Sequence, residues 1–287
     1  MNEKKSRKKG KIINIILVLM LLAGVVVVLY PTVSNWWKSL YATRAIASYV
    51  NAVEDLSDDE KAEMLEAARR YNESLPLGVR FTLSPEEYAV YERLLNVSGT
   101  GIMGFIQIPT IGVNLPVFHT VEDTVLQDAV GHIQGTSLPI GGETTHSVLS
   151  GHRGLPSARL LTDLDKVVEG DIFTVTVLDR TVTYLVDQIL VVLPEETEAL
   201  AIEKGEDYCT LVTCTPYGVN SHRLLVRGHR VENIYETEEV TQEALRLPSY
   251  LMFLAVGVPI LFIALVIALL VFRKKKNQIE RPEEKKE

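Results

Sequence analysis

The chain has 287 residues, of which 47% are hydrophobic and 23% charged, and its net charge is −8 at neutral pH. This composition excludes a disordered protein and allows one or two folded domains. Lys and Arg are concentrated at the two ends, so the middle of the chain is strongly acidic, which argues against a nucleic-acid partner.

Two uncharged apolar runs account for the basic ends. Ile12–Tyr30 and Tyr250–Phe272 would form helices about 28 Å and about 34 Å long, enough to cross a bilayer. Basic residues flank the outer end of each run, in a tail at 1–11 and a tail at 273–287. The positive-inside rule therefore places both termini in the cytoplasm and residues 31–249 outside. A cleaved signal peptide is the alternative for the first run, although no Ala-x-Ala sequence follows it.

Residues 31–98 have helical periodicity. An apolar face starts at Trp36, and Ser57 and Ser84 each open a capping-box pattern that predicts a further helix. Pro76 and Gly78 end the helix that follows Ser57, which leaves a lid-like loop over 75–83. We predict that these helices hold the rest of the protein away from the bilayer and pack on its side.

From Gly101 the pattern changes to short β-branched segments. Because they do not alternate regularly with helices, they favour a mainly β fold, a closed barrel over residues 99–233, over an α/β sheet. A juxtamembrane linker then fills 234–249. The predicted strands are Ile102–Ile108, Gly112–Val117, Ser147–Ser150, Ile172–Val177, Thr181–Val186, Ile189–Val192, Tyr208–Cys214 and Leu224–Arg230, with a short helix at Val121–Val130.

Two cysteines occur, near opposite ends of the predicted strand Tyr208–Cys214. Cys209 and Cys214 would lie about 16 Å apart on opposite faces, too far for a disulfide. We interpret Cys209 as a core residue. Cys214 precedes a turn that delivers Arg223 to the start of the next strand, an arrangement that suits a nucleophilic thiol beside a cation. A small buried cysteine next to a surface arginine is the alternative.

A cysteine nucleophile needs a proton partner, and the chain has six histidines. His152 follows the predicted strand Ser147–Ser150, so it lies at a strand end as Cys214 does, and position favours it; an exposed loop histidine is the alternative. His222 lies beside Arg223, and His229 lies in the last strand. The other three are predicted in loops or helices with no reason to converge: His119, His132 and His146. The sequence shows no recognisable metal-ligand cluster, and no cofactor is predicted.

These residues lie in sequence blocks that resemble the sortase family. The blocks are Thr-Leu-Val-Thr-Cys214, with Arg223 nine residues later, and Ser-Gly-His152-Arg-Gly-Leu-Pro upstream. Their continuations, Cys-Thr-Pro-Tyr-Gly-Val-Asn-Ser-His-Arg and Leu-Ser-Gly-His-Arg-Gly-Leu-Pro-Ser-Ala, are similar to the class C, pilus-assembling sortases. The second predicted span is also typical of that class, and the resemblance covers Leu94–Val231 densely.

The resemblance implies an eight-stranded barrel on the outer face of a Gram-positive membrane. Cys214 would attack the Thr–Gly bond of an LPXTG-like sorting signal on a secreted pilin or surface protein. A lysine amine of a pilin subunit would then resolve the thioester. His152 would protonate the leaving amine and deprotonate the incoming one, and Arg223 would hydrogen-bond the oxyanion.

One feature departs from the class C pattern. An Asp-Pro-aromatic lid motif is expected just before the helix that begins at Ser84, but Phe81, Thr82 and Leu83 stand there. Counting the contacts of Thr82 and Leu83, we expect the loop at 75–83 to be mobile or displaced and to restrain the site weakly, unless the rest of the loop packs well.

Three other functions are compatible with parts of this pattern. A membrane-bound cysteine peptidase would use the same thiol and imidazole with water as acceptor. A housekeeping sortase would attach proteins to the cell wall. A non-catalytic receptor or scaffold would need neither Cys214 nor Arg223.

Overall fold

The computed structural model describes residues 2–233 and Gly257. The predicted linker at 234–249, the second predicted span at 250–272 (apart from Gly257) and the tail at 273–287 lie outside the described residues. The described chain falls into two compact units that divide between Val33 and Ser34.

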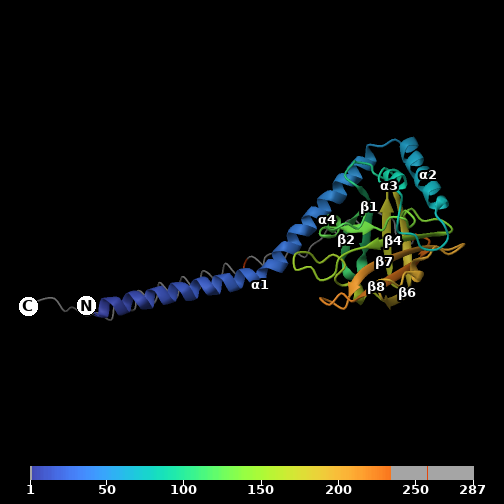
Figure 1. Cartoon of the computed structure of the whole chain (residues 1–287). Helices are drawn as coiled ribbons and strands as arrows, with labels where there is room; N and C mark the ends of the chain where they lie inside the picture. Colours follow the sequence, from blue (N-terminus) through green and yellow to red (C-terminus); the bar gives the residue numbers. More distant parts are fainter. Residues whose placement is uncertain (1, 234–256, 258–287) are drawn as a thin grey trace, which may run out of the picture. The chain divides into compact units, whose positions relative to one another are not determined.

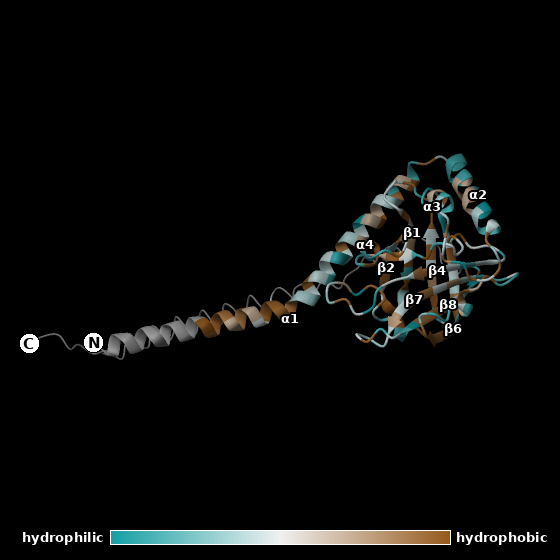
Figure 2. Cartoon of the chain, viewed as in Figure 1, coloured by the Kyte–Doolittle hydropathy of each residue, from teal (hydrophilic) through white to brown (hydrophobic). Residues whose placement is uncertain are grey.

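The first helix, α1 (Asn2–Glu54), merges the first predicted span and the helix predicted from Trp36 into one element. Pro31 lies inside it, where it removes one backbone hydrogen bond without ending the helix. Within the described part of the chain, one helix is long and apolar enough to cross a membrane, the Ile16–Glu54 portion of α1. Figure 2 shows the middle of α1 as hydrophobic and its later turns as mixed in hydropathy, and side chains such as Val28 are exposed (76%). Its length and composition support a membrane anchor near the N-terminus.

Beyond Ser34, α1 packs against the barrel through one face. Ala42, Ile46, Tyr49 and Val53 recur at helical spacing and are all buried. The Tyr49 hydroxyl donates to the carbonyl of Met103 (3.0 Å) and accepts from the amide of Leu178 (2.8 Å). This part of α1 is therefore fixed to two segments of the barrel.

Two shorter helices begin at the predicted capping boxes. α2 (Asp58–Ser74) is capped by Ser57 and α3 (Pro85–Tyr91) by Ser84, with the reciprocal glutamate contacts of Glu60 and Glu87 in place. Both pack beside the barrel (Figure 1). The predicted helical character of this region is confirmed.

Eight strands form a closed barrel in the order β1-β2-β3-β4-β7-β8-β6-β5. This confirms the predicted fold class. The strands are β1 (Ile102–Ile108), β2 (Val113–His119), β3 (Val130–His132), β4 (Thr145–Ser150), β5 (Ile172–Val177), β6 (Arg180–Val192), β7 (Asp207–Thr215) and β8 (His222–Val231). Short helical turns join them: η1 (Pro109–Ile111), α4 (Asp123–Leu126), η2 (Leu164–Lys166) and η3 (Glu198–Leu200).

Two of the strands differ from the predicted ones, and the order of the strands in the barrel departs from their order in the chain. The segments predicted at Thr181–Val186 and Ile189–Val192 are one strand, β6, with a register shift between Val186 and Gln188. β3 was not predicted, because three residues carry too little pattern. β7 lies between β4 and β8 and runs parallel to β4, so strands that are distant in the sequence are neighbours in the barrel.

The two faces of the central strand β7 have different surroundings. Cys209 and Leu211 belong to the main core together with residues of α1 and of the other strands, whereas Val212 belongs to a second apolar cluster. Since side chains alternate along a strand, Thr210, Val212 and Cys214 lie on the face opposite to Cys209 and Leu211. We call the second cluster the outer patch; its buried members are Val148, Leu200, Val212 and Leu225.

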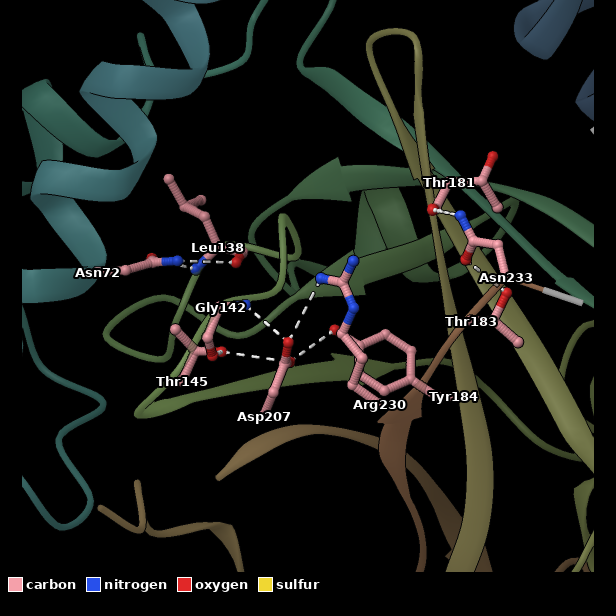
Figure 3. A network of polar contacts seen from close by, with 10 residues as sticks. All are labelled: Asn72, Leu138, Gly142, Thr145, Thr181, Thr183, Tyr184, Asp207, Arg230 and Asn233. Atoms are coloured by element: carbon pink, nitrogen blue, oxygen red, sulfur yellow. Dashed lines mark hydrogen bonds and ion pairs between the residues drawn. The ribbon is translucent and has the colours of Figure 1, made fainter. Parts of the chain in front are cut away.

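A polar network ties together the end of the barrel where β7 begins (Figure 3). The carboxylate of Asp207, the first residue of β7, accepts from the Gly142 amide (2.7 Å) and the Tyr184 hydroxyl (3.2 Å), and Arg230 lies 3.5 Å away. Asn72 of α2 joins the same end by pairing with both backbone groups of Leu138. A cavity of about 770 Å³ opens beside this network, between α2 and the 140–145 loop. The predicted site residues do not line it.

Candidate active site

Cys214 lies near the end of β7, and the two cysteines have different environments. Cys209 is fully buried, and burial strongly raises the pKa of its thiol, which keeps it protonated. Cys214 is half-buried and faces the opposite side of the strand. Both thiols are free, as predicted. The interpretation of Cys209 as a core residue is confirmed.

Arg223 lies directly across from Cys214. The two residues are register partners in the antiparallel β7–β8 pair, and a tight turn joins the strands. Within that turn the Val219 and Asn220 amides both donate to the Pro216 carbonyl. The Arg223 guanidinium donates to the backbone carbonyls of Asn220 (3.3 Å) and His222 (3.1 Å), which hold it over the turn.

His152 approaches from the other side of β7. In the parallel β4–β7 pair, Ser150 is the partner of Val212, and the Gly151 amide donates to the Val212 carbonyl (3.1 Å). The Thr213 hydroxyl also donates to the Gly151 carbonyl (2.8 Å). His152 follows Ser150 by two residues, as Cys214 follows Val212, so the chain segment that carries His152 leaves β4 next to the end of β7. Cys214 is therefore flanked by the His152 strand end and by Arg223.

Three histidines predicted in loops or helices lie in strands instead, which corrects that expectation. His119 ends β2 and its ring contacts the carbonyls of Gly101 and Leu94. Burial lowers the pKa of His132 in β3 to about 3 and that of His146 in β4 to about 4. Their ring nitrogens bond to groups within the core, so these histidines serve the fold. Sequence reasoning missed these strand positions because the surrounding turns masked the short strands.

The remaining two histidines, His222 and His229, lie on β8. His222 follows the turn, and its Nδ1 lies 2.9 Å from the Ser221 hydroxyl. His229 lies far along β8, where Nδ1 is 3.6 Å from Asp187. Among residues 2–233, no group of three or more His, Cys, Asp and Glu side chains could hold a metal ion.

The lid-like loop is more firmly packed than its sequence indicated. Val79 and Phe81 pack on the outer patch, and Leu83 packs against the main core. The Ile202 amide donates to the Gly78 carbonyl (3.3 Å), and Arg80 forms an ion pair with Glu87. The rest of the loop does pack, which is the condition under which a mobile or displaced loop is not expected: Thr82 and Leu83 are supplemented by the alternating pair Val79 and Phe81.

This packing places the loop on the face that carries the thiol. Val212 of the outer patch lies two residues before Cys214 on the same face of β7. Its partner Leu225 likewise lies two residues after Arg223 on β8. Val79 and Phe81 thus cover part of the outer patch, whose members Val212 and Leu225 lie on the strands that carry Cys214 and Arg223.

Comparisons with known proteins identify the family. The sortase domain family matches residues 106–231. The crystal structure of sortase C1 from Streptococcus agalactiae is 50% identical, with a TM-score of 0.65, and the alignment covers 66% of this chain and 99% of that chain. Sortase C of Streptococcus pneumoniae is 39% identical, with a TM-score of 0.61, over 67% of this chain and 99% of that chain.

A curated relative matches a smaller part. Sortase A of Streptococcus agalactiae serotype III is 31% identical over 117 residues, which are 40% of this chain and 47% of the relative. The chain thus spans about half the length of that relative. Because solved class C sortases match it over almost their whole length at 39–50% identity and share its barrel, this chain belongs to the sortase family and has class C sortases as its structural neighbours.

Proposed function

We propose that this chain is a membrane-anchored cysteine transpeptidase that joins proteins bearing LPXTG-like sorting signals to an amine. The observation that carries the proposal is the position of Cys214, half-buried at a strand end directly across from Arg223, on a strand that also pairs with the strand preceding His152. A nucleophile, a proton carrier and a fixed cation on one face are the groups that acyl transfer through a thioester needs.

In the first half-reaction, the Cys214 sulfur adds to the carbonyl of the threonine in the sorting signal. The developing oxyanion accepts hydrogen bonds from Arg223, whose planar guanidinium offers several donors in a fixed geometry. The C–N bond to glycine then breaks. His152, which holds the thiol proton as an imidazolium, gives that proton to the leaving amine.

In the second half-reaction, an amine attacks the thioester and His152 takes its proton. The sulfur leaves as the thiolate, and an isopeptide or peptide bond forms. We propose a lysine of a pilin subunit as the amine, which would make the product a pilus polymer. The likeness to class C sortases supports this acceptor, including a neighbour whose structure addresses pilin substrate specificity.

The apolar N-terminal helix supports a location at the membrane. We propose the barrel on the extracytoplasmic face, since secreted substrates and a cytoplasmic thiol would not meet, and two spans with both termini in the cytoplasm, since basic residues flank the outer end of each apolar run. Partners are then the bilayer, the sorting-signal protein and the acceptor subunit.

Mass spectrometry of the full-length protein with a sorting-signal peptide tests the mechanism. We expect a covalent adduct on the wild type and none on Cys214→Ala. Cys209→Ala is the matched control, because its thiol is buried on the opposite face and should leave adduct formation intact. An adduct on Cys214→Ala would exclude Cys214 as the nucleophile.

Acceptor choice tests the class. Product formation with a pilin lysine supports polymerisation, product with a cell-wall amine supports the housekeeping alternative, and hydrolysis unaffected by any amine supports a peptidase. Separate rates with each acceptor distinguish the three.

A further inference from the structure

Arg153 is a buried cation that contacts Thr215, the residue after Cys214, and Asp165 of η2. Its side chain is 8% exposed, and its Nη2 forms an ion pair with Asp165. Its Nη1 donates to the Thr215 hydroxyl at 3.0 Å. A buried charge is tolerated when it is paired and hydrogen-bonded, and these two partners bind the ends of the guanidinium while its buried Nε has no partner among the described residues.

The contact to Thr215 joins two strand ends that backbone hydrogen bonds leave separate. The last register pair of β4 and β7 is Ser150 with Val212, followed by the Gly151 amide donating to the Val212 carbonyl. Arg153 lies two residues beyond Gly151, and Thr215 lies three residues beyond Val212. Its side chain therefore continues the link between the strands where the backbone ladder ends.

The residues next to this link are the proposed reacting pair. His152 directly precedes Arg153, and Cys214 directly precedes Thr215. A shift of the Arg153–Thr215 contact would consequently change the separation of the imidazole and the thiol. Displacements of about 1 Å at reacting groups can reduce rates by about 100-fold.

Asp165, which pairs with the Arg153 guanidinium, lies in a segment that is itself held in place. It lies in η2, next to Leu164, which is fully buried in the main core. The Leu161 amide also donates to the His152 carbonyl (3.2 Å), and the Thr162 hydroxyl accepts from the Gly154 amide (3.2 Å). The segment that holds Asp165 thus contacts the backbone on both sides of Arg153.

Resting on the proposed function, we propose that Arg153 and Asp165 are positioning residues that hold His152 and Cys214 in reacting register through Thr215. A guanidinium serves this purpose because its rigid fork of donors bonds two acceptors at a fixed angle. A lysine ammonium is a compact charge on a flexible stem and lacks that geometry.

Steady-state transfer by the full-length protein in detergent provides the test, with an LPXTG-type peptide and a lysine-containing acceptor. Thr215→Val keeps the shape of the side chain but removes the acceptor oxygen. We expect kcat to fall about 10- to 100-fold while KM for the peptide stays within threefold. Thr215→Ser restores the acceptor and should rescue kcat, and Arg153→Lys should resemble Thr215→Val.

Two controls separate positioning from loss of folding. Arg159→Gln removes a nearby exposed arginine that pairs with Asp163 in the same segment, and it should leave kcat within twofold. Thermal unfolding of Thr215→Val should stay within a few degrees of the wild type. A kcat within twofold of the wild type in folded Thr215→Val, or no rescue by Thr215→Ser, would overturn the proposal.

Alkylation of Cys214 by iodoacetamide gives a measurement that needs no transpeptidation. Because the imidazole that takes the thiol proton would be displaced, Thr215→Val should react at least fivefold more slowly near neutral pH. An unchanged alkylation rate contradicts positioning. If the wild type transferred no peptide while Thr215→Val still slowed alkylation, the proposed substrate would fail and the positioning role would stand.

Discussion

Replacement of Phe81 by alanine should open the approach to Cys214. Phe81 and Val79 lie on the outer patch, whose member Val212 is two residues before the thiol on the same strand face. A sorting signal that reaches Cys214 along this face must displace the two side chains. We therefore expect Phe81→Ala to accelerate thioester formation with a sorting-signal peptide.

The packing of Phe81 sets the size of the effect. Complete burial of a phenylalanine contributes about 1.5–3 kcal/mol. Phe81 is only half-buried, so about half of this, roughly 1–1.5 kcal/mol, holds the loop on the patch. Since about 1.4 kcal/mol corresponds to a tenfold change in an equilibrium, the second-order rate constant for acylation should rise about five- to tenfold.

Acylation of the full-length protein can be followed by rapid quenching and mass spectrometry under peptide-limited conditions. Leu77→Ala is the matched control, because Leu77 lies in the same loop but is 63% exposed and outside the outer patch. The control should leave the rate within twofold. An unchanged or slower rate in folded Phe81→Ala would refute the idea that the loop competes with substrate for this patch.

Two further predictions concern pH and topology. Burial lowers the pKa of His146 to about 4, whereas an unfolded histidine titrates near 6.5. The unfolded state therefore binds more protons as the pH falls, and stability should decrease from about pH 6.5 to about pH 4 by up to about 3 kcal/mol. Urea unfolding would measure this loss, and His146→Gln should reduce it by that amount while the contribution of the similarly buried His132 remains; an equal loss in the variant contradicts the assignment. Reporter fusions at each terminus should both report the cytoplasm, and an extracytoplasmic C-terminus would exclude the two-span arrangement.

Local patterns predicted most of the elements. The capping boxes at Ser57 and Ser84 correctly marked the starts of α2 and α3, and β1 and β5 have the predicted bounds. These features depend on neighbouring residues, which the sequence displays directly. The parallel pairing of β7 with β4 depends on packing between distant segments, and hydropathy carries no record of which strands pair.

The same distinction applies to the candidate site. Cys214 and Arg223 are joined by one turn, so their opposition follows from a hairpin that the sequence predicts. His152 lies far away along the chain, and only the parallel pairing of β4 with β7 brings its strand end beside the thiol. Arg153 could have been suspected from its place in the His152 block. Its burial and its contact with Thr215 emerge only once both strand ends are placed.

Closure of the barrel restricts how a peptide can be recognised. The eight described strands leave no unpaired edge in their hydrogen-bonded order, so an extended peptide cannot bind by adding a further strand. Its backbone amides must instead be satisfied by loop backbones, side chains or water. Selectivity then depends on side-chain pockets and on the loops that frame the outer face. The same closure prevents the barrel from capturing other extended chains by indiscriminate strand pairing.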